Sequence, residues 1–260
     1  MSSVISHPWL LFLVLLVGLM LVVEIGIRLR SVSAGLDEQH QSLVQWAREG
    51  LTVLLSFLLG FALPMTLPYY EARRDLMIEE ENAIATLDHR AELLPAPYDQ
   101  RIRELLPQYV DARLDFARQD DDAAIRASAV RAVRLQTAMW REMVALVHEH
   151  PDMVNGQIAA LVSAGLGNLE DLSEKRLAAY ERRIPGTIWF VLTAISVLTC
   201  FVVGYSMQRR LFLAALVLPL TVAIVLSLVS ELENSRTGFI RNGQESMQRL
   251  RVELRAELGR

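Results

Sequence analysis

The residues that most clearly suggest a function lie in one apolar segment and recur every four residues. They are Val53, Phe57, Phe61 and Met65. In an α-helix this spacing places side chains near one another on a single face. Such a face can simply pack against lipid or neighbouring helices. If several copies of the helix surround a common axis, the same side chains form a narrow apolar constriction that gates a pore by dewetting. Both interpretations are open at this point.

Other groups that could carry chemistry have ordinary explanations. Glu24 is the only acidic residue inside an apolar segment, and Arg28 one turn later predicts an ion pair at the segment's end. His148 and His150 are two residues apart, so on a helix they point away from each other. The acidic run that begins at Asp120 fits the start of a helix better than a cation site. We therefore predict no metal site and no cofactor.

The sequence contains no recognisable catalytic motif. It has no glycine-rich phosphate loop, nucleophile elbow or zinc-protease signature, so we do not expect an enzyme. The single cysteine, Cys200, cannot form an intrachain disulfide. Glu79, Glu80 and Glu81 diverge on a helix, and we expect a solvated or intersubunit salt-bridge face there. A formal net charge of −4 gives no indication of a nucleic-acid partner.

Four apolar segments must position the candidate residues. They comprise residues 8–27, 51–70, 186–207 and 211–230. Each is close to the roughly 20 apolar residues that a helix needs to cross the hydrocarbon core of a bilayer. We therefore predict a membrane protein of the all-α class. Its four transmembrane helices should form two antiparallel pairs, with a long helical insertion outside the membrane between the second and third spans.

The polar insertion, residues 71–185, is expected to be a helical domain. Its first helix should end near Leu94, because Pro95 and Pro97 follow. Further helices are expected over residues 99–117, where Pro107 is a possible break, from the acidic run to about residue 148, and from Pro151 towards the membrane. The predicted domains are residues 1–70 with the first two spans, 71–185, 186–230 with the last two spans, and a helical tail, 231–260.

With four spans, the N-terminus, the polar insertion and the tail share one side of the membrane. Positive charge near the ends of spans favours the cytoplasm. The shared side carries Arg73, Arg74, Lys175, Arg176, Arg182, Arg183, Arg236 and Arg241, and the other side carries Arg28, Arg30, Arg48, Arg209 and Arg210. Arg28 and Arg30 alone would suggest the reverse. The larger group predicts cytoplasmic N- and C-termini.

Three short blocks resemble one protein family. The first reads Tyr70-Glu71-Ala72-Arg73-Arg74-Asp75, with Glu80, Glu81, Asn82 and Ala83 after it. The second is Arg183-Ile184-Pro185 followed by Ile188-Trp189, and the third is Asn234-Ser235-Arg236-Thr237-Gly238-Phe239-Ile240-Arg241. With the order of the spans, these blocks resemble the bacterial bestrophin-like membrane proteins, a domain of unknown function, from about residue 51 to the C-terminus. That family is more distantly similar to the bestrophin channels.

The resemblance implies a homo-oligomeric, pentameric ion channel of the bacterial inner membrane that conducts an inorganic ion. Val53, Phe57 and Phe61 would form its apolar neck. The motif residues that the resemblance places at the cytoplasmic mouth are Tyr70, Glu71, Arg73, Arg74, Glu80, Asn82, Asn234, Arg236, Gly238 and Arg241. Arg73, Arg74 and Arg236 could attract anions, whereas Glu71, Glu80 and Glu81 could favour cations. The sign of the ion is therefore open. The segment after the fourth span is only weakly acidic, so calcium gating is not supported.

A second hypothesis is a membrane-anchored helical scaffold or sensor that conducts nothing and binds a protein partner. The two hypotheses differ at the second span, because Phe57→Ala and Phe61→Ala should cause leak only if these side chains form a neck. An enzyme that acts on lipid is a third possibility, but the sequence offers no nucleophile and base for it.

Overall fold

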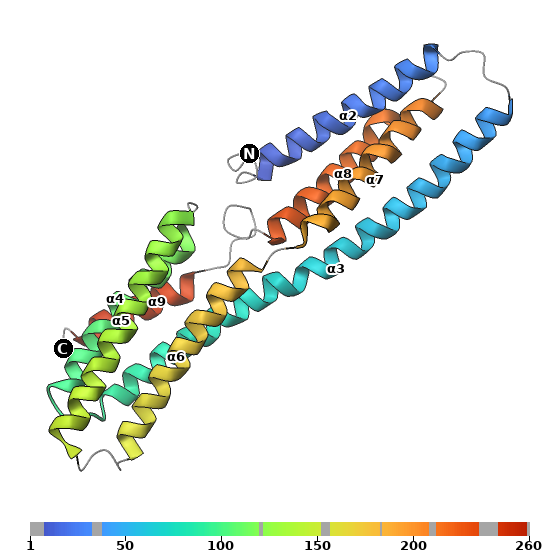
Figure 1. Ribbon diagram of the computed structural model, residues 1–260. Helices are drawn as coiled ribbons and strands as arrows, with labels where there is room; N and C mark the ends of the chain where they lie inside the picture. Colours follow the sequence, from blue (N-terminus) through green and yellow to red (C-terminus); the bar gives the residue numbers. More distant parts are fainter. Residues whose placement is uncertain are drawn as a thin grey trace. The chain divides into compact units, whose positions relative to one another are not determined.

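The computed structural model describes residues 8–32, 38–119, 122–151, 157–182, 184–207, 212–233 and 244–258. Helices account for nearly all of these residues, and none of them lies in a strand, which confirms the all-α prediction. The helices in these ranges are α2 (Pro8–Val32), α3 (Glu38–Ala91), α4 (Tyr98–Arg118), α5 (Asp122–Glu149), α6 (Gln157–Glu181), α7 (Gly186–Ser206), α8 (Phe212–Glu233) and α9 (Glu245–Leu258) (Figure 1).

Four helical stretches are long and apolar enough to cross a membrane, as predicted. The first, second and fourth stretches lie within α2, α3 and α8. The third, Gln157–Ser206, covers α6 and α7, and its most apolar part is α7. Few of their residues are buried inside the chain. An apolar surface of this kind suits a hydrocarbon environment, because it would be costly to expose to water.

The chain divides into two compact units that share α3. Unit 1 comprises residues 1–70 and 183–240, and unit 2 comprises residues 71–182 and 241–260. The described part of unit 1 holds α2, the N-terminal part of α3, α7 and α8. The described part of unit 2 holds the remainder of α3 with α4, α5, α6 and α9.

In unit 1 the first span packs against the third and fourth spans (Figure 1). Two glycines set the contact between α2 and α7. A Cβ atom at Gly204 would collide with the carbonyl oxygen of Val23, and one at Gly26 would collide with that of Phe201. Small residues at such crossings let two helix backbones approach closely within a membrane. The sequence analysis paired the first span with the second and the third with the fourth, and it did not predict this contact between α2 and α7.

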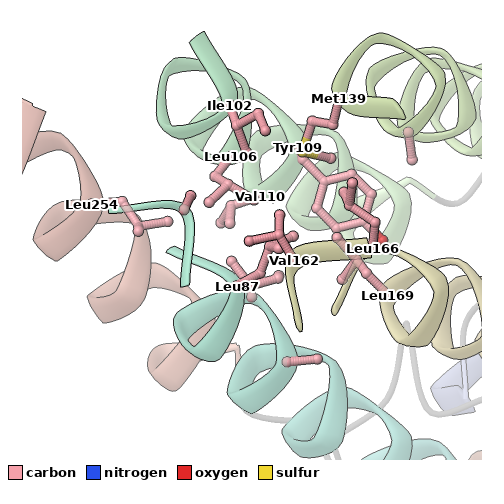
Figure 2. Close-up of a cluster of buried hydrophobic side chains, with 14 of the residues drawn as sticks. Leu87, Ile102, Leu106, Tyr109, Val110, Met139, Val162, Leu166, Leu169 and Leu254 are labelled. Carbon is pink, nitrogen blue, oxygen red and sulfur yellow. The ribbon is translucent and has the colours of Figure 1, made fainter. Parts of the chain in front are cut away.

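The core of unit 2 is built by side chains from the five helices that the structure describes in this unit. Figure 2 shows Leu87 of α3, Tyr109 of α4, Met139 of α5, Leu166 of α6 and Leu254 of α9 pointing into one cluster, and all five are buried. Burying a leucine or methionine side chain of this size stabilises a fold by about 1.5–3 kcal/mol. This cluster therefore accounts for a compact helical domain outside the apolar spans.

Pro107, the possible break, does not interrupt its helix and lies buried inside α4. Pro64 and Pro68 likewise lie inside α3, which continues from the second span into unit 2. The predicted break at Pro95 and Pro97 is confirmed, because α3 ends at Ala91 and α4 begins at Tyr98. The helix predicted in the C-terminal tail is also present as α9.

Candidate pore helix and its supporting ion cluster

One face of α3 in the second span is left uncovered by the described residues of the chain. It carries Val53, Phe57, Phe61 and Met65, whose exposed fractions are 70%, 60%, 54% and 51%. The rings of Phe57 and Phe61 contact each other, with 4.6 Å between their centroids. The four predicted residues thus lie along one exposed side of the helix.

The opposite face of the same helix packs against the other spans. Leu55, Ala62 and Thr66 are buried there, and the first two belong to a cluster that includes Leu192 of α7 and Val222 of α8. The second span therefore has one side fixed within unit 1 and one apolar side free to meet lipid or another copy of the chain.

Beyond the span, Arg73 holds the C-terminal end of α6. Its Nε donates a hydrogen bond to the carbonyl oxygen of Ala179 at 3.0 Å, and its Nη2 donates to that of Arg182, also at 3.0 Å. These carbonyls lie in the last turn of the helix, where backbone acceptors lack intrahelical donors. Arg73 therefore caps α6, a role that the sequence did not predict. Tyr70 beside it is half-buried, and Glu71 and Arg74 are exposed.

Glu80 does not lie on a solvated face, and that expectation was wrong. Its side chain has no exposed surface, and Arg113 Nε lies 2.8 Å from Oε1. Arg176 Nη1 binds Oε2, and the Tyr109 hydroxyl donates a hydrogen bond to Oε1. Glu80 points into unit 2 because all of its partners lie on α4 and α6. It is consequently unavailable to line a pore mouth.

The electrostatics of this buried cluster keep Glu80 ionised. Burial raises the pKa of Glu80, but the charges of Arg176 and Arg113 outweigh burial and leave the pKa below its ordinary value. Burial and the neighbouring carboxylate raise the pKa of Tyr109, so its hydroxyl remains a donor. The Arg113 guanidinium also lies over the Phe116 ring, 4.9 Å from its centroid. One carboxylate thus joins α3, α4 and α6.

The remaining motif residues fall in two groups. Asn82 is exposed and lines a groove between α3 and α6 in unit 2, with a volume of 410 Å³. Asn234, Arg236, Gly238 and Arg241 lie outside the described residues.

The end of α8 is bound to the start of α7 through Glu233, which sequence reasoning did not single out. Its Oε1 accepts a hydrogen bond from the backbone N–H of Ile184 at 3.0 Å, and its Oε2 accepts one from Trp189 Nε1 at 2.9 Å. A carboxylate at a helix N-terminus also interacts favourably with the helix dipole. The sequence offered one signal for this contact: Glu233 lies at the end of one apolar span, and Trp189 lies near the start of another.

A cluster of possible metal ligands near the end of α3 is already paired. Ligand atoms of Asp88, His89 and Glu92 lie within 4.8 Å of one another. However, Arg103 Nε binds Asp88 Oδ1 at 3.0 Å, and its Nη2 lies 3.2 Å from Glu92 Oε1. Because Arg103 already pairs with both carboxylates, we assign no metal to them. The ion pair predicted between Glu24 and Arg28 is present at 2.9 Å.

A family model of the bestrophin-like domain matches residues 8–244. This chain belongs to the bestrophin-like family. The crystal structure of a bacterial bestrophin homologue from Klebsiella pneumoniae matches with a TM-score of 0.70 at 17% identity, over 95% of this chain and 98% of that one. A mutant of a Klebsiella pneumoniae homologue matches with a TM-score of 0.71 at 17% identity, over 95% and 99%. A crystal structure described as that of a membrane protein matches with a TM-score of 0.71 at 18% identity, over 95% of this chain and 98% of that one.

The likeness to these structures establishes the bestrophin fold for this chain, and no curated protein matches it. Membership of the bestrophin-like family confirms the resemblance drawn from the three sequence blocks, and the match extends to the first span. Together with the four apolar helices, it makes this bestrophin-like chain a multi-pass membrane protein.

Proposed function

We propose that this bestrophin-like protein is a homo-oligomeric ion channel of the bacterial inner membrane, and that α3 lines its pore. The observation that carries the proposal is the exposed face of the second span, where Val53, Phe57 and Phe61 are uncovered while Leu55 and Ala62 are buried. An exposed apolar face of this kind can simply contact lipid. In a bestrophin-like chain it can instead face an axis that several subunits share.

In this proposal the apolar face forms the neck of the channel. Copies of α3 around an axis bring the Phe57 and Phe61 side chains of neighbouring subunits towards one another. A narrow ring of such side chains excludes water when it closes and admits a hydrated ion only when it widens. Within each subunit the two phenyl rings contact each other, so both contribute to the same section of the neck.

Unit 2 lies on the cytoplasmic side in the proposed topology, together with the N- and C-termini. More positively charged residues lie near the ends of the spans on this side than on the other, and the positive-inside tendency supports this topology. The Glu80 cluster and Arg73 then have a supporting role, because they fix α4 and α6 to α3 where this helix leaves the membrane.

A non-conducting scaffold is the alternative, and one exposed surface of unit 2 is compatible with it. The outer face of α5 exposes Val130, Val133 and Val144, with exposed fractions of 51%, 54% and 52%. Apolar residues that recur on one exposed helix face are suited to contact another protein. The same face could equally contact a neighbouring subunit, so it does not by itself favour a scaffold over a channel.

The number of subunits tests the proposal directly. We expect native mass spectrometry of the full chain in mild detergent to show one closed ring, with a pentamer as the family resemblance implies. A ring makes a central pore geometrically possible. A monomer or a simple dimer would remove the shared axis and would overturn the channel proposal in favour of a scaffold.

A further inference from the structure

We propose that the groove between α3 and α6 in unit 2 binds a small hydroxylated molecule with one anionic head group. The groove has a volume of 410 Å³, which lies within the usual range for small-molecule sites. All of its lining residues belong to unit 2, so the inference depends neither on the membrane spans nor on ion conduction. Its support comes from an oriented guanidinium at one end of the groove and from polar side chains without partners along the remainder.

The two helices run in opposite directions, which sets the order of the charged groups along the groove. Arg90, near the C-terminal end of α3, donates a hydrogen bond to a backbone carbonyl near the N-terminal end of α6. Further along, the ion pair between Glu80 and Arg176 joins the same two helices. The groove residues Glu79 and Lys175 directly precede the members of this pair. Arg90 therefore lies at one end of the groove, and Glu79 and Lys175 lie together at the other.

The guanidinium of Arg90 is held in a fixed orientation. Its Nη1 donates a hydrogen bond to the carbonyl oxygen of Leu161 at 3.2 Å, and a Cβ atom at Gly165 would lie 3.5 Å from the same nitrogen. A guanidinium offers five N–H donors in a rigid fork that matches the oxygens of a phosphate or a carboxylate. Because the contact with Leu161 engages only Nη1, Arg90 can still present donors to an anionic head group in the groove.

The other polar side chains of the groove have no partner among the residues that the structure describes. The side chains of Asn82, Thr86 and Asn168 form no hydrogen bond there, and Glu79 and Lys175 form no ion pair although both line the same groove. All five residues are exposed. Ligand sites place a few polar groups on a cavity in this way, where these groups fix the orientation of the ligand.

The chemistry of these groups favours hydroxyls in the part of the groove beyond Arg90. The amides of Asn82 and Asn168 both donate and accept hydrogen bonds, as a hydroxyl does. At the far end Glu79 only accepts and Lys175 only donates, so a hydroxyl can bind to both, whereas an anion would meet the carboxylate and a cation would meet the ammonium. None of the described lining residues is aromatic, so the groove has no platform for a flat ring. A sugar phosphate or a sugar acid has the required chemistry.

Isothermal titration calorimetry of the full-length protein in detergent tests the site. Glucose 6-phosphate and gluconate combine a hydroxylated body with one anionic head group, whereas glucose supplies the body alone and inorganic phosphate the head alone. We expect at least one of the two combined probes to bind saturably, about tenfold or more tighter than either glucose or inorganic phosphate. The preference between the combined probes identifies the head group as a phosphate or a carboxylate.

Variants of the groove locate the binding. Arg90→Lys keeps the charge but removes the rigid fork, so it should weaken binding of the preferred probe about tenfold or more. Asn168→Ala removes an amide that has no partner among the described residues, so it should fold normally and weaken binding about threefold or more. Arg134→Lys, on the exposed surface of α5, is the matched control for Arg90→Lys and should leave the affinity unchanged.

Three results would overturn the assignment. The first is the absence of saturable binding of both combined probes. The second is an equal affinity for inorganic phosphate and glucose 6-phosphate without binding of gluconate, which would indicate an adventitious ion only. The third is an affinity that Asn168→Ala leaves unchanged, and this variant decides the question even if Arg90→Lys does not fold. Because calorimetry requires no ion flux, none of these results depends on whether the protein is a channel.

Discussion

Arg113 Nε lies 2.8 Å from Glu80 Oε1, and both side chains are buried in unit 2. Arg176 binds the other oxygen of the same carboxylate. Removing one partner from a buried ion pair is costly, because the remaining charge has lost both water and its counter-ion. Glu80 is thus the point at which α3, the proposed pore helix, is fixed to α4 and α6.

Glu80→Gln should lower the free energy of unfolding by about 3–5 kcal/mol. Glutamine has nearly the same volume, so the loss reflects two uncompensated guanidinium groups and not a cavity. Denaturant unfolding of the protein in detergent measures the change. Glu81→Gln, at a neighbouring half-buried position, should change stability by only about 0.5 kcal/mol. Equal losses in the two variants would contradict the role assigned to Glu80.

The stability contributed by Glu80 should be lost only in acid. Its pKa lies below the ordinary value, since Arg176 and Arg113 overcome the upward effect of burial. A carboxyl group of this kind stabilises the fold above its unfolded pKa of about 4.3, and the contribution disappears as the pH falls through its folded pKa. Burial raises the pKa of Asp88, but that residue is present in both proteins and cancels in their difference.

We therefore expect the difference in stability between the wild type and Glu80→Gln to be constant from about pH 8 to pH 6 and to narrow below about pH 4. Unfolding curves recorded at each pH give this difference. A difference that already narrows near neutral pH would mean that Glu80 is protonated in the folded protein.

Gly204→Ala should separate the first and third spans. The added methyl group would meet the carbonyl oxygen of Val23, which belongs to helix backbone and cannot move alone. We expect a loss of about 1–3 kcal/mol or a failure to assemble. Gly18→Ala is the control, because no atom lies within 4 Å of a Cβ at that position on α2. Thermal stability in detergent is the readout, and an unchanged Gly204→Ala protein would refute the close crossing.

Trp189 and Glu233 should be energetically coupled. Trp189→Phe removes the Nε1 donor and keeps an aromatic ring, while Glu233→Gln removes the charge of the acceptor. In a double-mutant cycle of unfolding free energies we expect a coupling of about 0.5–3 kcal/mol. Additive effects would show that the hydrogen bond between the ends of α7 and α8 contributes nothing measurable.

The sequence predicted the elements of this fold well, because their signals are local. Twenty or so apolar residues indicate a span wherever they occur, and Pro95 and Pro97 end a helix regardless of its neighbours. Pro107 was harder to interpret, since a proline within a packed helix can be tolerated when tertiary contacts hold the helix together. The exposed stripe from Val53 to Met65 was likewise recognisable from periodicity alone.

Contacts between distant segments were not predictable in the same way. Glu79, Glu80 and Glu81 are chemically alike in the sequence, and only the packing of α3 on α4 and α6 buries the middle one. Arg176, one of the partners of Glu80, is 96 residues away. Gly26 and Gly204 also become significant only as a pair. The spacing of residues within one helix does not reveal which residues of another helix they contact.

The rate of ion flux from proteoliposomes tests the central claim most directly. If Phe57 and Phe61 form the neck, the variant that carries both Phe57→Ala and Phe61→Ala should release ions faster than the wild type, because a wider ring stays hydrated. Phe190→Ala, on the exposed surface of α7, is the matched control and should leave the rate unchanged. A double variant no faster than the wild type and Phe190→Ala would contradict the assignment of α3 as the pore helix.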